Sequence, residues 1–454
     1  MVYDVIIIGG GASGLFAASL LKVNKGLILE RNKSVGTKLL MSGNGQCNIT
    51  HGGNIKDYID KYGDKGKIIR SCLYKNNNIA LINHLESLGV PLYERKDGKV
   101  FPVSMKATDV KVAMVKAAKK NGFDIKTGAY VTAVESASFI TQTRDKSDVN
   151  NLSHKVTQND SNVKYIDDDI ITVEASLIGD GIEKYKTKNV IIAPGGASYP
   201  STGSDGSFIN VLKKIKPTAI IRPLKPALVP IYVENYAFSE MSGISFDKAG
   251  ITIYKNARSI TNPKTISKEG SLLLTHKCFS GPLIIDSSRY IETGDRITIN
   301  YCNGFSAERL VSELKKAAVG SSKSVVTIVL DVFTNAGYTM PQRFVSAVIN
   351  EVFLDAPKNK ENNRRATELS KELLVKIAKA FTEMPFIVSG LGSFREAMCT
   401  SGGLDLSEVD LKTMEWIPNI YVIGEVLDVD GDTGGYNLQF AFSSAAAAIS
   451  NIRL

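Results

Sequence analysis

The N-terminal residues alternate between apolar runs and a glycine-rich turn. Residues 5–8 form a short β-branched run, and Gly9, Gly11 and Gly14 follow it in the pattern GxGxxG. Small residues then continue as a helical pattern, and a second apolar run, residues 26–30, ends in a glutamate. This order predicts a strand, a tight turn, a helix and a second strand, which together form a βαβ unit.

Further along the chain the pattern changes twice. Apolar residues at helical spacing between 108 and 121 are followed by strand-like runs. Residues 188–206 then form a buried strand that runs into a turn rich in Gly, Ser and Pro. Residues 207–380 then hold alternating, strand-like pieces followed by helix-rich stretches. A buried strand at 420–423 and an alanine-rich helix end the chain, so the character of the N-terminal part returns at the C-terminus.

The glycine pattern has a mechanical reading that depends on its place between a strand and a helix. Gly9 permits a tight turn, Gly11 lets the backbone approach a pyrophosphate, and Gly14 lets helix and strand pack closely. The helix N-terminus would then hold the phosphates. Glu30, at the end of the second strand, is positioned to accept hydrogen bonds from ribose hydroxyls, which favours FAD or NAD over a 2′-phosphorylated nucleotide. The alternative is a glycine-rich turn without a ligand.

We therefore predict an α/β fold: a Rossmann-like FAD/NAD(P)-binding domain with an inserted β-barrel plus helical domain. The dinucleotide domain is expected to combine residues 1–206 and 381–454, and the insert to span 207–380, helical at about 281–345. Residues 137–165 are rich in Ser, Asp, Asn, Thr and Lys, which predicts an extended, mobile hairpin tip without a chemical role.

Composition excludes several classes of protein. The net charge of +9 is spread along the sequence without a block of like charges, so it is only a weak sign of nucleic-acid binding. Five scattered cysteines and four histidines lack the spacing of a disulfide framework or a metal site, which favours a reducing cytoplasm and no metal. The N-terminal apolar run carries Asp4 and several glycines, so we expect neither a signal peptide nor a membrane span.

Several motifs together resemble one bacterial family, the BaiN-like or YhiN-like FAD-dependent oxidoreductases, which include enzymes named aminoacetone oxidases. The motifs are IIGGGASGLFAA, GTKLLMSGNGQCNIT, FPVSMKATDV, APGGASYPSTGSDG, LTHKCFSGP and GEVLDVDGDTGGYNLQFAFSS. The resemblance covers nearly the whole chain. It implies an FAD-binding domain built from both chain ends and an insert composed of a β-barrel and a helical subdomain.

The resemblance also implies which residues border FAD. The loop that contains KLLMSGNGQCN would run along the cofactor, although Asn44 and Gln46 depart from the usual glycine and basic residue of the family. Glu425 stands where many flavoproteins have aspartate. The expected cofactor-binding residues are Gly9, Gly11, Ala12, Ser13, Gly14, Glu30, Arg31, Lys38, Ser42, Gly43, Asn48, Val131, Ala193, Gly195, Gly424, Glu425, Asn437, Leu438 and Gln439.

The last three of these residues open the C-terminal helix, where the resemblance places the flavin pyrimidine edge. A helix N-terminus there would stabilise negative charge on reduced flavin. The alternative is a plain helix with Asn437 as its N-cap. Candidate proton donors are Tyr436, Tyr199, His276 and Cys47, and each has a purely structural alternative, so the catalytic residue stays unassigned.

Two functions from different classes remain open at this stage. The first is an FAD-dependent oxidoreductase that reduces a small carbonyl or enone with NAD(P)H, or oxidises such a substrate or an amine. A second GxGxxG is absent, so NAD(P)H would visit only transiently. The second is a flavin-binding protein that acts on RNA or has no catalytic role. Because the basic residues do not cluster, a small-molecule substrate is the stronger prediction and a nucleic-acid partner the weaker; the oligomeric state is not predicted.

Overall fold

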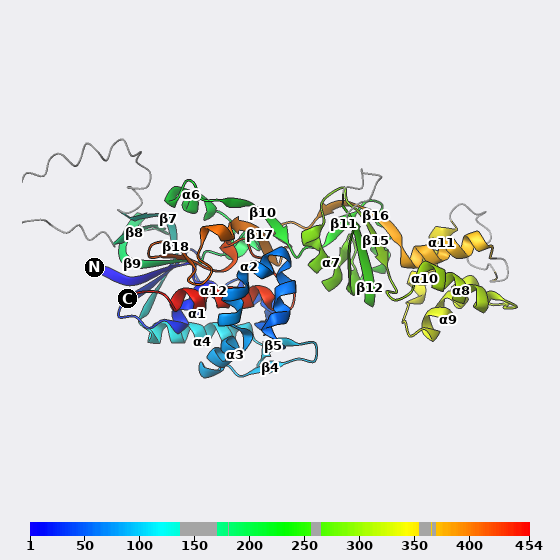
Figure 1. Cartoon of the computed structure of the whole chain (residues 1–454), viewed down its shortest axis with the longest axis horizontal. Helices are drawn as coiled ribbons and strands as arrows, with labels where there is room; N and C mark the ends of the chain where they lie inside the picture. Colours follow the sequence, from blue (N-terminus) through cyan, green and yellow to red (C-terminus); the bar gives the residue numbers. More distant parts are fainter. Residues whose placement is uncertain (137–169, 180, 256–264, 354–364, 366–368) are drawn as a thin grey trace, which may run out of the picture. The chain divides into compact units, whose positions relative to one another are not determined.

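The computed structural model describes residues 1–136, 170–179, 181–255, 265–353, 365 and 369–454. The predicted hairpin tip at 137–165 lies outside these residues. Contacts divide the chain into two compact units (Figure 1). Unit 1 comprises Met1–Pro226 and Ala397–Leu454, and unit 2 comprises Ala227–Glu396. The chain therefore leaves unit 1 once and returns to it once.

Unit 1 is built on a mostly parallel sheet with the strand order β18-β19-β9-β1-β2-β6. Strand β8 extends it as an antiparallel neighbour of β9, and β7 pairs antiparallel with β8. The strands are β1 (Val2–Ile8), β2 (Gly26–Glu30), β6 (Phe123–Thr127), β7 (Ala129–Ser136), β8 (Ile171–Leu177), β9 (Gly181–Ile192), β18 (Glu415–Ile417) and β19 (Ile420–Val422). Because β1, β2, β9 and β19 run parallel, their carboxyl ends meet at one edge of the sheet. This arrangement confirms the predicted Rossmann-type fold.

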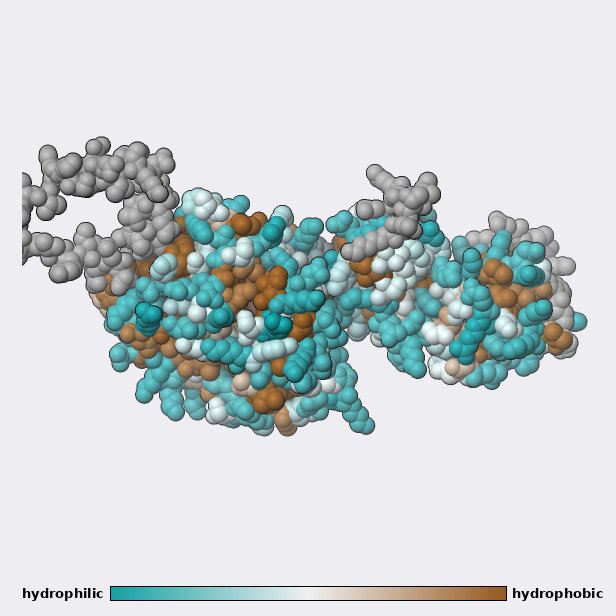
Figure 2. Space-filling model, viewed as in Figure 1, coloured by the Kyte–Doolittle hydropathy of each residue, from teal (hydrophilic) through white to brown (hydrophobic). Residues whose placement is uncertain are grey.

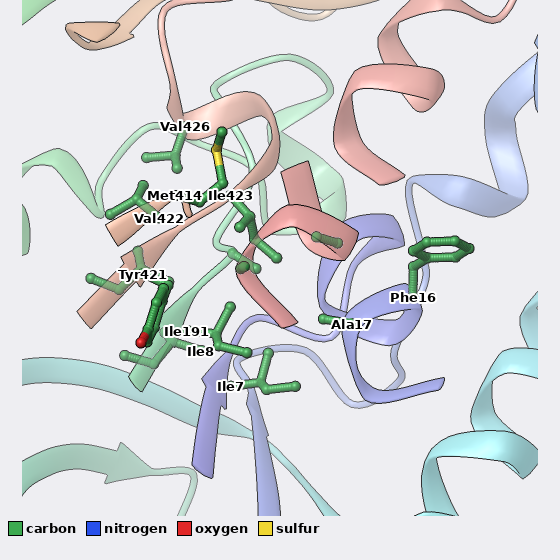
Figure 3. Packing of buried hydrophobic residues seen from close by; sticks show 14 of the residues in the cluster. Ile7, Ile8, Phe16, Ala17, Ile191, Met414, Tyr421, Val422, Ile423 and Val426 are labelled. Atoms are coloured by element: carbon green, nitrogen blue, oxygen red, sulfur yellow. The ribbon is translucent and has the colours of Figure 1, made fainter. Parts of the chain in front are cut away.

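Helices from both chain ends bury side chains in the same apolar core as this sheet. They are α1 (Ala12–Leu20), α2 (Gly66–Lys75), α3 (Asn78–Ser87), α4 (Ala107–Lys120), α6 (Ile209–Ile215) and α12 (Tyr436–Ile449). The rings of Phe16 in α1 and Phe442 in α12 lie 4.5 Å apart between centroids. Figure 3 shows Ile7 and Ile191 of the adjacent central strands in the same apolar core as α1. The first and last helices of the chain thus share one core.

Smaller elements complete unit 1. The strands β3 (Thr50–His51), β4 (Leu92–Glu94) and β5 (Lys99–Pro102) form a three-stranded sheet, and β10 (Ile221–Ala227) pairs with β17 (Cys399–Leu404). The pair of β10 and β17 lies where the chain leaves unit 1 and returns to it. Short 3-10 segments include η1 (Leu39–Gly45), η2 (Ile55–Lys65), η4 (Pro200–Thr202) and η10 (Gly424–Val426).

Unit 2 contains a closed six-stranded barrel and a group of helices that share one apolar core. The barrel strands are β11 (Ile231–Val233), β12 (Ser245–Tyr254), β13 (Thr265–Leu274), β14 (Phe279–Ser280), β15 (Arg296–Asn300) and β16 (Met384–Leu391). The helices are α7 (Pro282–Ser287), α8 (Ala307–Ala318), α9 (Val325–Asn335), α10 (Gln342–Val352) and α11 (Lys371–Thr382). The barrel with attached helices agrees with the insert that the sequence predicted.

Contacts divide the two units at residues other than the predicted limits of 207 and 380. Helix α6, which those limits assign to the insert, packs on β7 within unit 1. Strand β16, which they assign to the third segment, pairs with β15 and β11 and closes the barrel. Within the range 281–345, expected to be helical, β15 is a barrel strand. The predicted limits follow changes in the local sequence pattern. Helix α6 and strand β16 instead belong to the units that contain their packing partners, which are distant in the chain.

Candidate cofactor site at the carboxyl edge of the sheet

The three glycines of the turn between β1 and α1 differ in their surroundings. A Cβ on Gly9, whose φ is +101°, would lie 2.3 Å from the carbonyl oxygen of Ala193. A Cβ on Gly14 would lie 2.0 Å from the carbonyl oxygen of Gly9. A Cβ on Gly11 meets no atom within 4 Å. Gly9 and Gly14 therefore allow the backbone to pack closely at the turn. Gly11, at the N-cap of α1, faces open space beside the unpaired N–H groups of the first helical turn.

Glu30 lies at the end of β2 with only 7% of its surface exposed. Its carboxylate accepts the backbone N–H of Gly10 at 2.8 Å and that of Asn32 at 2.9 Å. Burial raises the pKa of Glu30, although both N–H groups oppose the shift. A carboxylate has about four acceptor positions, so two hydrogen bonds leave capacity for ribose hydroxyls.

Arg31 is held by partners from the segment that follows β9. Its guanidinium lies 2.8 Å from the carboxylate of Asp205 and donates to the carbonyl oxygen of Gly203 at 3.1 Å. The same group lies over the ring of Tyr130, 5.0 Å from its centroid. Val131, the next residue of β7, is buried and pairs with Ala175 of β8. The structure thus brings Arg31 and Val131, both expected to bind the cofactor, to the same region.

Lys38 and Glu425 form an ion pair that joins two distant segments. The Glu425 carboxylate also accepts from the hydroxyl of Ser198 at 2.7 Å and from the backbone N–H of Thr400 at 2.9 Å. The ammonium of Lys38 lies 2.9 Å from the hydroxyl oxygens of both Ser198 and Ser204. Burial favours a higher pKa for Glu425, but Lys38 and the hydrogen bonds outweigh it, so the pKa lies below its ordinary value.

The loop after Lys38 is folded more regularly than its polar composition indicates. Segment η1 contains a kink at Ser42, Gly43 and Asn44, and Thr50–His51 pair with β5. A Cβ on Gly43 would lie 2.8 Å from the backbone nitrogen of Asn48. With its amide oriented to satisfy both neighbours, Asn48 donates to the carbonyl oxygen of Thr50 and accepts from the N–H of Gly435. The loop is therefore tied to the start of α12.

The structure corrects the alternative in which Asn437 caps the last helix. The N-cap of α12 is Gly435, with φ +99°, and the helix begins at Tyr436. The side chain of Asn437 instead accepts from the N–H of Gly431 at 2.8 Å and donates to its carbonyl oxygen at 2.9 Å. Only a residue in the left-handed region fits the cap position, which favours glycine over asparagine there.

Gln439 and Leu438 differ from Asn437 in their surroundings. Gln439 is fully buried, and its amide contacts the hydroxyl of Thr50 at 2.5 Å and the carbonyl oxygen of Asn76 at 3.2 Å. Its backbone N–H donates to the carbonyl oxygen of Gly435. Leu438 is partly buried against the core. The Gln439 side chain thus holds α12 in place, and contact of these three residues with flavin stays a prediction.

A hollow lies beside the end of the returning strand β9. Ala193 directly follows this strand, and the hollow is lined by Gly195, Gly196, Gly206, Phe208, Ile209, Leu224, Glu425 and Val426. Gly424 faces Ser13 of α1, because a Cβ on Gly424 would lie 2.6 Å from the Ser13 hydroxyl oxygen. Residues of the N-terminal turn, the β9 end and the C-terminal segment therefore meet at one edge, as predicted for a cofactor held by both chain ends.

The four candidate proton donors lie in different settings. Tyr436 is buried, and its ring stacks on His51 at 5.4 Å between centroids. Tyr199 adopts φ +51° immediately before η4. Cys47 is fully buried, and burial raises its pKa to about 11, which opposes a thiolate role. His276 is exposed in unit 2, whereas the other three belong to unit 1.

Sequence reasoning missed the polar residues that hold Lys38 and Glu425. Ser198 and Ser204 stand inside the motif APGGASYPSTGSDG, so that motif carried a signal for them. Thr400 had no such signal, although its hydroxyl accepts from the N–H groups of Ala197 and Ser198 at 2.7 and 3.0 Å. Contacts of this kind depend on strands that meet only in the folded chain.

The residues at this edge fit a dinucleotide. Gly11 and the first turn of α1 offer N–H groups and open space for a pyrophosphate, and Glu30 offers acceptors for a ribose. In the part of the chain that the structure describes, no group of three or more His, Cys, Asp or Glu residues is arranged to hold a metal ion. No helix among the described residues is long and apolar enough to cross a membrane.

Similarity to known proteins extends over nearly the whole chain. The sequence model of the "HI0933-like protein Rossmann domain" matches residues 3–156 and 144–451. A "Ribosomal RNA dihydrouridine synthase" of Haemophilus influenzae is 27% identical over 98% of both chains. A protein of the same name from Escherichia coli is 25% identical over 99% of this chain and 98% of its own. A "3-dehydro-bile acid delta(4,6)-reductase" of Clostridium scindens is 24% identical over 97% of both chains.

Proposed function

The chain belongs to the HI0933-like Rossmann family, and from this premise we propose that it is an FAD-dependent reductase of C=C bonds conjugated to a carbonyl group. The names of all three relatives support this reaction class. Formation of dihydrouridine saturates a ring C=C bond next to a carbonyl, and a delta(4,6)-reductase acts on C=C bonds of a 3-oxo compound. The observation that carries the proposal is the edge at which Gly11, Glu30 and Glu425 meet.

The residues of this chain would bind and orient the reactants. The turn at Gly11 and the first turn of α1 would hold the pyrophosphate, and Glu30 would hold a ribose. Lys38 and Glu425 would fix the loop that borders the redox ring, while the N-terminus of α12 favours negative charge near it. When bound, FAD supplies hydride-transfer chemistry. In the net reaction the substrate gains a hydride and a proton, and NAD(P)H, the proposed donor of the two electrons, becomes NAD(P)+.

For the substrate, we propose uridine in RNA. The two relatives that are named ribosomal RNA dihydrouridine synthases are matched over nearly their whole length. A net charge of +9 favours a polyanionic partner. The distribution of charge along the sequence, taken alone, made an RNA partner the weaker prediction; the proposal now adopts that partner.

A small enone is the second candidate, favoured by the similarity to the bile-acid reductase. Both candidates require reduction of the same kind of bond, so the reaction class does not distinguish them. A small substrate needs only the site itself, whereas RNA needs a further surface for its backbone.

An anaerobic stopped-flow titration tests the reaction class, and re-oxidation tests the substrate. We expect NADH or NADPH to bleach the flavin absorbance of the purified protein. The reduced protein is then mixed with an unmodified transcript of ribosomal RNA or with a panel of enones, and dihydrouridine is measured by mass spectrometry of the digested RNA. Bleaching by neither nucleotide would contradict the reductase and favour an oxidase. Re-oxidation by enones alone would favour the small substrate.

A further inference from the structure

Helix α2 exposes one continuous basic face. At 100° per residue, Lys67, Arg70, Tyr74 and Lys75 fall on the same side of the helix, and all four are exposed. The opposite side carries Gly66, Ile69, Cys72 and Leu73, which are buried. The helix contains no acidic residue. The outer face of α2 is therefore cationic along its whole length.

These charges are available for a partner. Among the residues that the structure describes, Lys67, Arg70 and Lys75 have no carboxylate within ion-pair distance. A basic run of unit 1 near α6 and β10 is partly neutralised, because Lys216 pairs with Glu408 and Arg222 with Asp405. Uncompensated charge on one helix face favours an extended anion.

The same face carries an aromatic side chain. Tyr74 is 37% exposed between the basic residues, and its neighbour Ile68 is 49% exposed. An exposed ring among cations is the combination that binds single-stranded nucleic acid, since bases stack on the ring while cations contact phosphates. Figure 2 shows hydrophilic and hydrophobic side chains interspersed on this side of unit 1.

The position of α2 connects this face with the candidate cofactor site. The carbonyl oxygen of Asn76, at the C-terminal end of α2, accepts from Gln439 at 3.2 Å and from Ser443 at 2.5 Å. Lys65, immediately before α2, pairs with Asp428 in the segment between η10 and α12. A helix is about 10 Å across, so a partner on the outer face of α2 lies about one helix diameter from α12.

From these observations we propose that the outer face of α2, formed by Lys67, Arg70, Tyr74 and Lys75, is a docking surface for the backbone and an unstacked base of RNA. This inference rests on the proposed RNA substrate. The cations would contact phosphates and fix the register of the strand, while the ring of Tyr74 would hold a base. The reacting uridine would then be presented to the edge near α12.

The test compares two variants that each lose three positive charges. K67Q/R70Q/K75Q removes the α2 face. K116Q/K119Q/K120Q removes three exposed lysines of α4, which ends near Gly26 at the amino edge of the sheet. Binding of FAD-loaded protein to a fluorescein-labelled RNA stem-loop is measured by anisotropy at several salt concentrations. We expect the α2 variant to bind about tenfold more weakly. The slope of the logarithm of its binding constant against the logarithm of salt concentration should be smaller by about one per lost cation. The α4 variant should bind as the wild type does.

Tyr74 supplies an independent readout. Tyr74→Ala should weaken binding about fivefold or more because stacking is lost, whereas Tyr74→Phe should bind as the wild type does. Arg70→Lys keeps the charge and should retain most of the affinity. Equal weakening by both triple variants, no weakening by either, or loss of binding to anionic phospholipid vesicles without loss of binding to RNA would overturn the proposal. Flavin bleaching by NAD(P)H, measured on the wild type without RNA, tests the reductase separately.

Discussion

Lys38 and Glu425 are 387 positions apart in sequence and still form one ion pair. Their side chains are 27% and 19% exposed, so solvent screens the pair only in part. Ser198 and the backbone of Thr400 supply further donors to the carboxylate. At the scale of single residues, this network links the loop after β2 to the ends of β9 and β19.

We expect the two partners to be energetically coupled. Lys38→Met leaves a poorly solvated carboxylate, and Glu425→Gln leaves an ammonium with fewer acceptors, so each should lower the free energy of unfolding by about 1–3 kcal/mol. The double variant should lose less than the sum of the two. Urea unfolding of all four proteins measures this coupling, and strictly additive losses would contradict it.

The same pair predicts a pH dependence. The folded-state pKa of Glu425 lies below its ordinary value, so the stabilisation is present above the unfolded-state pKa and is lost as the pH falls through the folded one. The difference in unfolding free energy between wild type and Glu425→Gln should therefore shrink on acidification below the ordinary pKa of glutamate. Urea titrations at a series of acidic pH values measure it; a difference that grows on acidification has the wrong sign.

Cys47 is expected to be structural. Because burial raises its pKa to about 11, its thiol stays protonated near neutral pH and reacts slowly. We expect Cys47→Ala to keep NAD(P)H-dependent flavin bleaching within about threefold of the wild type, since no proton transfer passes through the thiol. Alkylation of the native protein by iodoacetamide, followed by peptide mass spectrometry, should leave Cys47 unmodified until the protein unfolds. Rapid labelling at neutral pH would exclude this interpretation.

At the scale of elements, local sequence patterns predicted helices and strands better than they predicted contacts between distant segments. The strand, turn and helix at the N-terminus were readable because GxGxxG has a steric reason at each position, and the structure gives β1 and α1 there. The start of α12 was misjudged when Asn437 was considered as its cap, because Gly435 has the required left-handed conformation. In the polar loop after Lys38, Thr50–His51 pair with β5, a contact that local sequence does not show.

Substitution of Gly14 and of Gly11 in the turn after β1 should affect folding stability and FAD binding separately. Gly14→Ala places a methyl group 2.0 Å from a backbone oxygen, so it should lower the unfolding free energy by about 1–3 kcal/mol. Gly11 has φ −80° and open space, so Gly11→Ala should leave the stability of the flavin-free protein nearly unchanged. It should nevertheless weaken FAD retention, because the methyl group enters the space expected for the pyrophosphate. Thermal unfolding and flavin content measure the two effects, and equal effects of both variants would contradict the assignment.

At the scale of the whole molecule, the return of one pattern at both chain ends predicted a domain built from two segments. The family match confirms the predicted resemblance and the class of FAD-dependent oxidoreductase. The sequence could not indicate which residues of the two segments meet, since the partners Ser198, Thr400 and Glu425 are joined only by sheet topology. Contacts of the expected FAD neighbours with the cofactor stay a prediction.

All expected cofactor-binding residues lie in unit 1, which predicts that unit 1 binds FAD without unit 2. Strands β10 and β17 pair where the chain leaves and returns, so a short Gly/Ser linker can replace Ala227–Glu396 without spanning a long gap. We expect the shortened protein to unfold cooperatively and to retain flavin absorbance, because its apolar core is separate from that of unit 2. Gly11→Ala in the shortened protein serves as the control and should lose the flavin. A shortened protein that folds but stays colourless with excess FAD would show that unit 2 contributes to the cofactor site.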